Sequence, residues 1–171
     1  MQNIYSYTVP LFTKLLKGLK TVLGKAEKHA KDLNLSEESI LSDALAPDMF
    51  PLKKQVQIAC DNAKGLVSRL TQNENPVHPD SEVTFAELQS RIDTVLEMLE
   101  LVTAKDFDGA EKLKITLPYF PGKYMMGDEY AIDYALPNFV FHVTTAYAIV
   151  RKNGVQIGKS DFMHSLPFKD I

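Results

Sequence analysis

Two side chains that can bind a metal ion or a polar ligand, Asn138 and His142, lie four residues apart in the mostly apolar run 135–150. On a helix this spacing places both side chains on the same face. Three environments fit such a pair: a buried, hydrogen-bonded His–Asn contact in the core, a small-molecule pocket, or a metal site. The surrounding elements must decide among these three.

Gln55 and His29 are the other residues placed to reach such a site. Gln55 lies at the edge of the apolar stripe of a helix expected at residues 51–70, and His29 flanks the stripe of the first expected helix. A catalytic metal normally needs about three protein ligands, so a metal at His142 would need this help. The candidate ligand-binding residues are therefore His142, Asn138, Gln55 and His29, and the alternative is a divalent metal such as zinc or nickel at His142 and Asn138.

The remaining reactive side chains form no catalytic pattern. Cys60 is the single cysteine and has neither a CxxC partner nor an identifiable base, so we expect no disulfide and no nucleophile there. His78 lies in a proline-flanked loop and His164 in the tail, where we expect both to be solvated. The sequence contains no Gly-rich phosphate loop, no G-x-S-x-G and no H-E-x-x-H motif.

Apolar residues recur at three- and four-residue steps in four segments, which predicts four amphipathic helices. The expected helices cover residues 8–33, 51–70, 84–102 and 128–153. Thr8 and Pro10 suit the start of the first helix, and Thr84 with Glu87 forms a capping-box sequence at the start of the third. Four such helices with a long first connection predict an all-α four-helix bundle.

The second expected helix offers two polar groups to the interior. Its apolar stripe is centred on Ala59, and Gln55 and Asn62 fall at the edge of that stripe. Gln57 and Asp61 point away from it, despite their four-residue spacing. We therefore expect Gln55 and Asn62 to be the polar side chains of this helix that reach the core.

The last expected helix, residues 128–153, is apolar on almost all sides, which is typical of a central helix or a helix at an interface. We expect its outer face, around Val140 and Tyr147, to pack against a second subunit or to be covered by the tail, residues 155–171. Pro137 removes one backbone hydrogen bond and predicts a kink. Before this helix, alternating residues and a Pro-Gly turn predict a small hairpin arm.

The composition of the 171-residue chain, with 45% hydrophobic and 24% charged residues, is typical of a soluble globular protein. A net charge of −3 argues against nucleic-acid binding, which requires a basic surface. No run reaches the roughly 18 apolar residues that span a bilayer, and the N-terminus lacks a signal-peptide pattern. We therefore expect a cytoplasmic protein with one domain over residues 1–171 and no nucleic-acid or membrane partner.

Several segments form a pattern that covers most of the chain. The most specific one reads Leu-Pro-Asn-Phe-Val-Phe-His at residues 136–142 and continues to residue 147. The others are residues 45–52, 55–59, 63–65, 84–88 and 153–155. Together they resemble the DinB-like (YfiT-like) superfamily, and in particular its uncharacterised domain-of-unknown-function subgroup found in bacteria and fungi.

The resemblance implies a four-helix bundle that is often dimeric. Members of the broader superfamily often bind a divalent metal through three histidines, one on the second helix and two in an H-x-x-x-H pair on the fourth. Some members are metal-dependent thiol transferases or hydrolases. Here the pair reads Asn138-x-x-x-His142, and the second-helix position falls at Ile58 or Ala59, so one of the three ligands is retained.

We therefore expect a helical bundle of unknown function that forms a homodimer and binds a small ligand near His142 and Asn138, with no complete catalytic site and no cofactor. The alternative is a metal-dependent DinB-like enzyme, a thiol transferase or hydrolase, with a degenerate metal site. A pure interaction module without any ligand is the third option.

Overall fold

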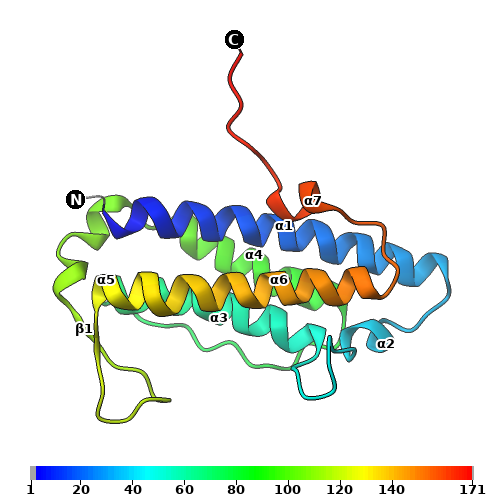
Figure 1. Ribbon diagram of the computed structural model, residues 1–171, viewed down its shortest axis with the longest axis horizontal. Helices are drawn as coiled ribbons and strands as arrows, with labels where there is room; N and C mark the ends of the chain where they lie inside the picture. The colour runs from blue at the N-terminus through cyan, green and yellow to red at the C-terminus, as the bar shows by residue number, and fades with distance from the viewer. Residues whose placement is uncertain (1–2, 171) are drawn as a thin grey trace.

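The computed structural model describes residues 3–170, and residues 1, 2 and 171 of the expected domain lie outside the described range. Four long helices lie side by side, as Figure 1 shows, and confirm the predicted all-α four-helix bundle. Among the described residues, none of the helices is both long and apolar enough to cross a membrane. The long helices are α1 (Ile4–Asp32), α3 (Leu52–Thr71), α4 (Phe85–Glu100) and α6 (Leu136–Lys152).

The four helices run in two directions: α1 and α6 point one way, and α3 and α4 point the other (Figure 1). At one end of the bundle, the Asn3 side chain donates to the Ala104 carbonyl oxygen at 2.8 Å. At the other end, the Phe85 amide donates to the Glu37 carboxylate at 2.7 Å, which joins the start of α4 to α2 (Glu37–Leu41). Because α3 and α4 are parallel, the chain must cross the length of the bundle between them.

The crossover is formed by residues 72–84, a segment without helix or strand. Two of the bonds that tie it to α3 come from side chains of that helix to backbone carbonyls: the Lys64 ammonium donates to Pro76 at 2.7 Å, and the Ser68 hydroxyl donates to Glu74 at 3.2 Å. His78 is half-buried rather than solvated as expected, and this burial lowers the pKa of its imidazole. The crossover therefore forms a fixed edge along α3.

The predicted hairpin arm is confirmed, with shorter strands than its sequence pattern indicates. Strands β1 (Lys114–Ile115) and β2 (Met125–Met126) pair in antiparallel fashion, with Lys114 opposite Met126 and Ile115 opposite Met125. The hairpin arm is defined here as residues 113–126. The chain reaches it from α4 through two short 3₁₀ helices, η1 (Ala104–Phe107) and η2 (Ala110–Lys112).

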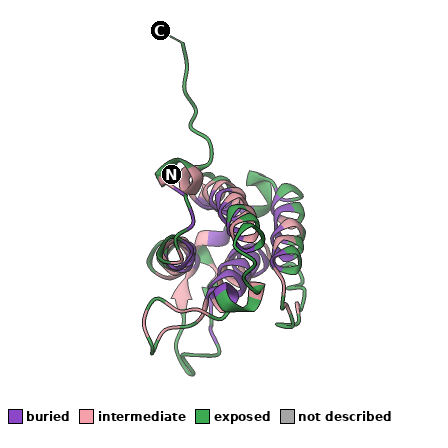
Figure 2. Ribbon diagram, turned by 90° about the vertical axis from the view of Figure 1, so that its right-hand side faces the viewer, coloured by how far each residue is buried: buried purple, intermediate pink, exposed green. Residues whose placement is uncertain are grey.

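The inward faces of the long helices form the core, which Figure 2 shows as buried ribbon turned toward the centre of the bundle. Phe12 from α1 stacks on Phe139 from α6, with ring centroids 4.1 Å apart. A stacked aromatic pair contributes about 0.5–1.5 kcal/mol beyond the burial of its area. The inward face of the last helix consists of the buried residues Ala131, Ala135, Phe139, His142, Ala146 and Ile149.

The start of α1 differs from the prediction. Asn3 is the N-cap, and its side-chain oxygen accepts a bond from the Tyr5 amide at 2.9 Å. Thr8, the predicted cap, lies inside the helix, where its hydroxyl donates to the Ile4 carbonyl at 2.7 Å. Pro10 lies inside α1 as well. The buried Ile4 extends the apolar stripe by a turn, and this packing offsets the backbone hydrogen bond lost at Pro10.

The last helix contains a change of helical type. It begins as α5 (Gly127–Glu129), continues through the π-helical turn η3 (Tyr130–Ala135) and then forms α6. The sequence predicts a kink at Pro137. The structure has a π turn just before this proline: it ends at Ala135, and α6 begins at the next residue, Leu136. A π turn bonds each amide one residue further back than an α-helix does, so it rotates the side chains that precede it relative to those that follow.

The C-terminal segment packs against α1 and α6 through α7 (Lys159–Met163), as Figure 1 shows. The ring of Phe162 meets that of Tyr147 edge to face, with centroids 5.9 Å apart. Gly18 permits this approach, because a Cβ atom at this position would lie 2.4 Å from the Phe162 carbonyl oxygen. Of the two expectations for the outer face of the last helix, cover by the tail is confirmed at Tyr147.

Candidate functional site

A cleft of about 450 Å³ opens between α3, the η3–α6 helix, the hairpin arm and the crossover. Its volume lies within the range of sites for small molecules, roughly 300–1,000 Å³. Helix α3 lines it with Lys54, Ile58, Asp61, Asn62 and Arg69. The other elements line it with Phe50, Asp80, Leu117, Tyr119, Tyr130, Tyr134 and Asn138.

Asn138 is the residue predicted for the site that does line this cleft. It is half-buried, and its Nδ2 donates to Oδ1 of Asn62 on α3 at 3.0 Å. Asn62 in turn donates to the Ile58 carbonyl at 3.0 Å. These bonds use one N–H of each amide, and no donor among the described residues binds the Asn138 Oδ1 atom. The cleft therefore presents an amide oxygen that can accept a bond from a ligand.

His142 is buried outside the lining of the cleft, where it binds Gln55 of α3. Its Nδ1 lies 2.6 Å from the Gln55 Oε1 atom, and the Gln55 Nε2 atom donates to the Phe50 carbonyl at 2.9 Å. Because that carbonyl fixes the amide nitrogen, the amide oxygen accepts and His142 carries its proton on Nδ1. Burial lowers the pKa of the imidazole, so His142 is neutral at neutral pH.

A His142–Asn138 hydrogen bond, one of the three environments that the spacing allows, is not formed. Each residue instead binds its own partner on α3, His142 to Gln55 and Asn138 to Asn62. Both partners are the residues predicted to lie at the edge of the α3 stripe, and that prediction is confirmed. Helices α3 and α6 pack antiparallel, and these polar edges face each other across the interface between them. The hydrogen bonds therefore join the two helices, and none joins His142 to Asn138 along α6.

His29 lies in another part of the bundle. A Cβ atom on Gly154, just past the end of α6, would lie 3.9 Å from the His29 Nε2 atom. Gly154 follows His142 by twelve residues, which corresponds to about 18 Å along a helix. The position near one end of the bundle is the expected one, but the structure does not bring His29 together with His142, Asn138 and Gln55.

The three-histidine metal centre implied by the resemblance does not fit these residues. The second-helix position holds the apolar Ile58 and Ala59, and Asn138 is bonded to another amide, so that His142 is the one imidazole of the implied set. Within residues 3–170, no group of three or more His, Cys, Asp and Glu side chains is placed to hold a metal ion. This donor set lacks the imidazoles and thiolates that zinc and nickel prefer.

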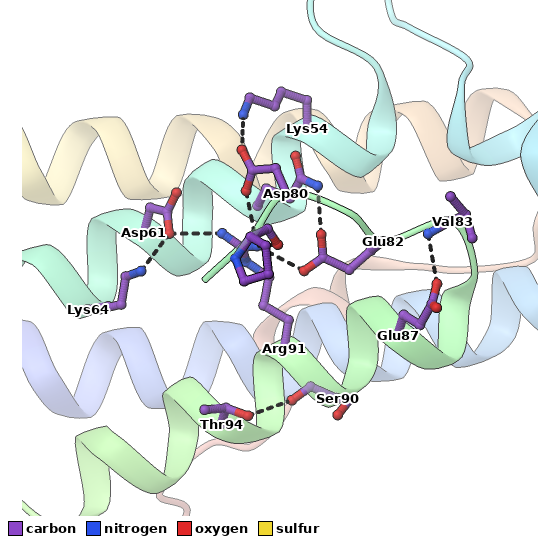
Figure 3. A network of polar contacts seen from close by, with 12 residues as sticks. Lys54, Asp61, Lys64, Asp80, Glu82, Val83, Glu87, Ser90, Arg91 and Thr94 are labelled. Carbon is purple, nitrogen blue, oxygen red and sulfur yellow. Dashed lines mark hydrogen bonds and ion pairs between the residues drawn. The ribbon is translucent and has the colours of Figure 1, made fainter. Parts of the chain in front are cut away.

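A network of ion pairs borders the cleft where the crossover meets α3 and α4. Figure 3 shows Arg91 of α4 among three carboxylates, with N–O distances of 2.9 Å to Asp61, 3.1 Å to Asp80 and 2.8 Å to Glu82. Gln57, which the sequence predicts to point away from the apolar stripe, is instead buried, and it donates to Glu82 of the crossover at 2.8 Å. Asp61, which points away as predicted, thus binds a cation from the neighbouring helix.

Two lysines of α3 extend this network. Lys64 pairs with Asp61 at 3.1 Å, and Lys54 pairs with Asp80 (Figure 3). Burial raises the pKa of Asp80, but the bond and charge of Lys54 and the charge of Arg91 outweigh it, so the pKa lies below its usual range. Both carboxylates that line the cleft, Asp61 and Asp80, are therefore paired with neighbouring cations.

Arg69, the other cation in the wall of the cleft, has a different setting. Its Nη1 donates to the Tyr130 hydroxyl oxygen at 3.2 Å, and its guanidinium carbon lies 5.8 Å from the centroid of that ring. Among residues 3–170, no carboxylate oxygen lies within 4.0 Å of the Arg69 nitrogens. Burial raises the pKa of the Tyr130 hydroxyl, although Arg69 acts to lower it, so the phenol keeps its proton near neutral pH.

Arg69, Tyr130 and Tyr134 are site residues that the sequence analysis does not single out. The two tyrosine rings stack with centroids 5.9 Å apart, and both belong to the π turn. A regular angle of about 100° per residue therefore misplaces them relative to the rest of the last helix. The glycine at position 65, four residues before Arg69, is a signal in the sequence for this corner of the cleft. A Cβ atom there would lie 2.3 Å from the Arg69 Nη1 atom, so the arginine side chain takes the space of a larger residue.

Comparison with known proteins gives the chain a family but no function. The family model described as "Domain of unknown function (DUF1993)" matches residues 4–163. The crystal structure of a DinB family member protein from Shewanella denitrificans is similar, with a TM-score of 0.93 and 46% sequence identity over 98% of this chain and 95% of that one. No curated protein matches the chain.

Proposed function

This chain belongs to the DUF1993 family and has the DinB-like bundle that its sequence predicts, and we propose that it binds a small organic molecule in the cleft beside Asn138. The observation that carries the proposal is the cleft itself, about 450 Å³, with an amide oxygen of Asn138 that no described donor occupies. In this proposal the protein is a ligand-binding bundle without a complete catalytic centre.

The chemistry of the lining supports a small organic ligand. Ligand sites combine apolar and aromatic walls with a few polar groups that fix orientation. Here Ile58, Leu117 and Tyr134 supply apolar surface, while Asn138 and Arg69 supply polar groups. The exposed ring of Tyr119 on the hairpin arm stands at the edge of the same cleft.

His142 and Gln55 have a supporting role in this proposal. Their 2.6 Å hydrogen bond joins α6 to α3, the two long helices that form opposite walls of the cleft. A buried bond of this kind fixes the relative position of two helices because breaking it leaves a polar group without a partner. We therefore assign His142 and Gln55 to positioning the walls, and Asn138 to contact with the ligand.

A metal-dependent thiol transferase or hydrolase remains the alternative function. It would require further ligands beside His142, because a catalytic zinc keeps about three protein ligands. The proposed binding function passes through no metal ion. Elemental analysis of protein purified without an affinity tag separates the two: stoichiometric metal that is lost in His142→Ala supports the enzyme and contradicts the ligand-binding proposal.

The binding proposal is tested by a screen of small organic fragments, monitored by amide chemical shifts in NMR spectra. We expect fragments that bind to shift amides of residues in the cleft lining. Ile58→Trp, which fills the cleft, should abolish these shifts, whereas Leu101→Trp, at an exposed position outside the lining, should leave them unchanged. Fragments that bind only elsewhere, or that bind Ile58→Trp equally well, would contradict the proposal.

The homodimer and the cytoplasmic location remain predictions. We propose that the dimer implied by the resemblance forms in solution. A mass from light scattering equal to twice that of the 171-residue chain would support it, and the mass of one chain at micromolar concentration would contradict it.

A further inference from the structure

We propose that the ligand of the cleft carries a single carboxylate, which Arg69 binds together with the Tyr130 hydroxyl, and an aromatic or other planar apolar group next to Tyr134. This inference rests on the proposed binding function and names the chemical class of the ligand. Four features of the cleft lead to it: the unpaired guanidinium, the neutralised charges around it, the free hydroxyl proton and the aromatic walls.

The Arg69 guanidinium is half-buried and is held in place by a neutral group. Its nearest polar partner is the Tyr130 hydroxyl oxygen, 3.2 Å from Nη1, and the ring of the same tyrosine faces the guanidinium carbon. An arginine has five N–H donors, so most of its donors remain available after this one bond. A partly desolvated cation with free donors is a site at which an anion gains a charge-assisted hydrogen bond.

The remaining charges of the cleft do not compete for this anion. Asp61 is paired with Arg91 and Lys64, and Asp80 is paired with Arg91 and Lys54. The positive charge left without a carboxylate in this region is therefore the one on Arg69. A single excess cation matches one negative charge on a ligand, whereas a phosphate dianion would call for a second cation at the same point.

Tyr130 adds a directed donor beside the guanidinium. Because its oxygen accepts a bond from Arg69, its hydroxyl hydrogen is free to point elsewhere. The side chain is 1% exposed and its ring stacks on Tyr134, which holds the hydroxyl in one place. A carboxylate has two oxygens, so one can accept from the guanidinium and the other from the phenol.

The walls of the cleft define the rest of the ligand. Tyr134 lies between Tyr130 and Asn138 along the η3–α6 helix, and Ile58 lies one turn beyond Asn62 on α3, on the side away from Arg69. Arg69 and Asn62 are seven residues apart on α3, about 10 Å along the helix. A planar ring attached to a carboxylate fits that span, with its apolar faces against the tyrosine and its far edge near the Asn138 oxygen.

The test compares three probes of similar shape and different charge: cinnamate, its neutral amide cinnamamide, and the cation cinnamylamine. Affinities are measured at pH 7.5 by NMR titration, which also reports where each probe binds. We expect cinnamate to bind in the cleft at least tenfold more tightly than cinnamamide, as a charge-assisted hydrogen bond predicts. Cinnamylamine should show no binding there, because the guanidinium repels it.

Four variants assign the preference to the guanidinium. Arg69→Gln should reduce the affinity for cinnamate to that for cinnamamide, and Arg69→Lys, which keeps the charge and loses the fork, should keep part of the preference. Gly65→Ala keeps the charge but displaces the Arg69 nitrogen, so it should weaken cinnamate binding as well. The matched control is Arg151→Gln on α6, outside the cleft lining, which should bind cinnamate like the unchanged protein.

The outcomes separate this inference from the function on which it rests. Equal affinity for cinnamate and cinnamamide, with both shifting amides of the cleft, overturns the carboxylate and leaves the binding function intact. A preference for cinnamate that persists in Arg69→Gln also overturns it. If cinnamate binds nowhere in the cleft while other fragments do, the carboxylate inference fails alone. If no fragment of the screen binds there, both fail.

Discussion

Arg91 on α4 and Arg69 on α3 have opposite settings. The Arg91 side chain is 2% exposed and lies within 3.1 Å of three carboxylates, whereas Arg69 is half-buried against a tyrosine. The first setting surrounds a buried charge with three carboxylates and makes it a structural joint, although the buried Nε atom has no hydrogen-bond partner. The second leaves a charge that a small molecule can satisfy. The comparison shows that pairing, rather than residue type, distinguishes a structural arginine from one available to a ligand.

The segments that reach each arginine explain the difference. The crossover brings Asp80 and Glu82 to Arg91, so this long connection and α4 are fastened to α3 through the same guanidinium. The region around Arg69 is reached instead by the π turn with Tyr130 and by the hairpin arm. One edge of the cleft is therefore closed by charge pairs and the other is lined with aromatic side chains.

The largest expected effect comes from removing the paired arginine. Arg91→Met leaves Glu82 and Asp61 without their main cation in a partly buried setting, so we expect the free energy of unfolding to fall by about 3–5 kcal/mol. Urea denaturation followed by circular dichroism measures the loss. A decrease below about 1 kcal/mol would remove the contrast between the two arginines, because Arg91 would then behave as a surface cation.

A neutral joint on the other side of α3 should have an intermediate effect. His142→Ala removes the bond to Gln55 and some buried packing, so we expect a loss of about 1–3 kcal/mol in the free energy of unfolding. The same denaturation experiment measures it. An unchanged stability would show that this bond does not hold α6 against α3, and the positioning role assigned to His142 would be wrong.

The joint at His142 also predicts a dependence on pH. Burial lowers its pKa in the folded protein below the ordinary value of 6.5, so the unfolded chain binds the proton more readily. The stabilisation is complete above pH 6.5 and is lost as the pH falls through the folded pKa. His78 contributes with the same sign, since burial lowers its pKa too.

The His142 contribution is isolated by a matched variant. His142→Asn cannot titrate, so its stability should vary less than that of the unchanged protein when thermal unfolding is measured from pH 7.5 down to about pH 5. Equal slopes in the two proteins would contradict the assignment. Glu82 and Asp80 contribute little above pH 5, because their pKa values lie below the ordinary values of 4.5 and 3.8.

The smallest effect on stability is expected for the unpaired arginine. Arg69→Gln removes no ion pair and keeps a polar side chain, so the free energy of unfolding should change by about 0.5 kcal/mol or less. Chemical denaturation of this variant beside Arg91→Met gives the comparison directly. If Arg69→Gln costs as much as Arg91→Met, Arg69 is a structural residue, and its availability to a ligand loses its support.

The fold follows from local patterns in the sequence, and the cleft follows from contacts that those patterns do not contain. Three- and four-residue periodicity, the Thr84–Glu87 capping box and the hairpin turn predict the bundle and its arm, because each depends on residues close in sequence. The stripe of α3 also places Gln55 and Asn62 at its edge. These are the parts of the site that a regular helix determines.

The other parts depend on irregular segments. The π turn rotates Tyr130 toward Arg69 in a way that a regular helical angle cannot give. The crossover brings Glu82 into contact with Arg91. This contact depends on the path of an irregular segment, which helical periodicity does not predict. For the same reason, the partner of Asn138 is Asn62 on another helix rather than His142 one turn away.

The most direct test of the central claim, that the Arg69 corner of the cleft binds an organic anion, is a crystal structure of the protein with cinnamate. We expect one carboxylate oxygen within about 3 Å of an Arg69 nitrogen, the other near the Tyr130 hydroxyl, and the ring beside Tyr134. A cinnamate molecule whose carboxylate instead contacts Lys54 or Arg91, or lies outside the cleft, would contradict the account.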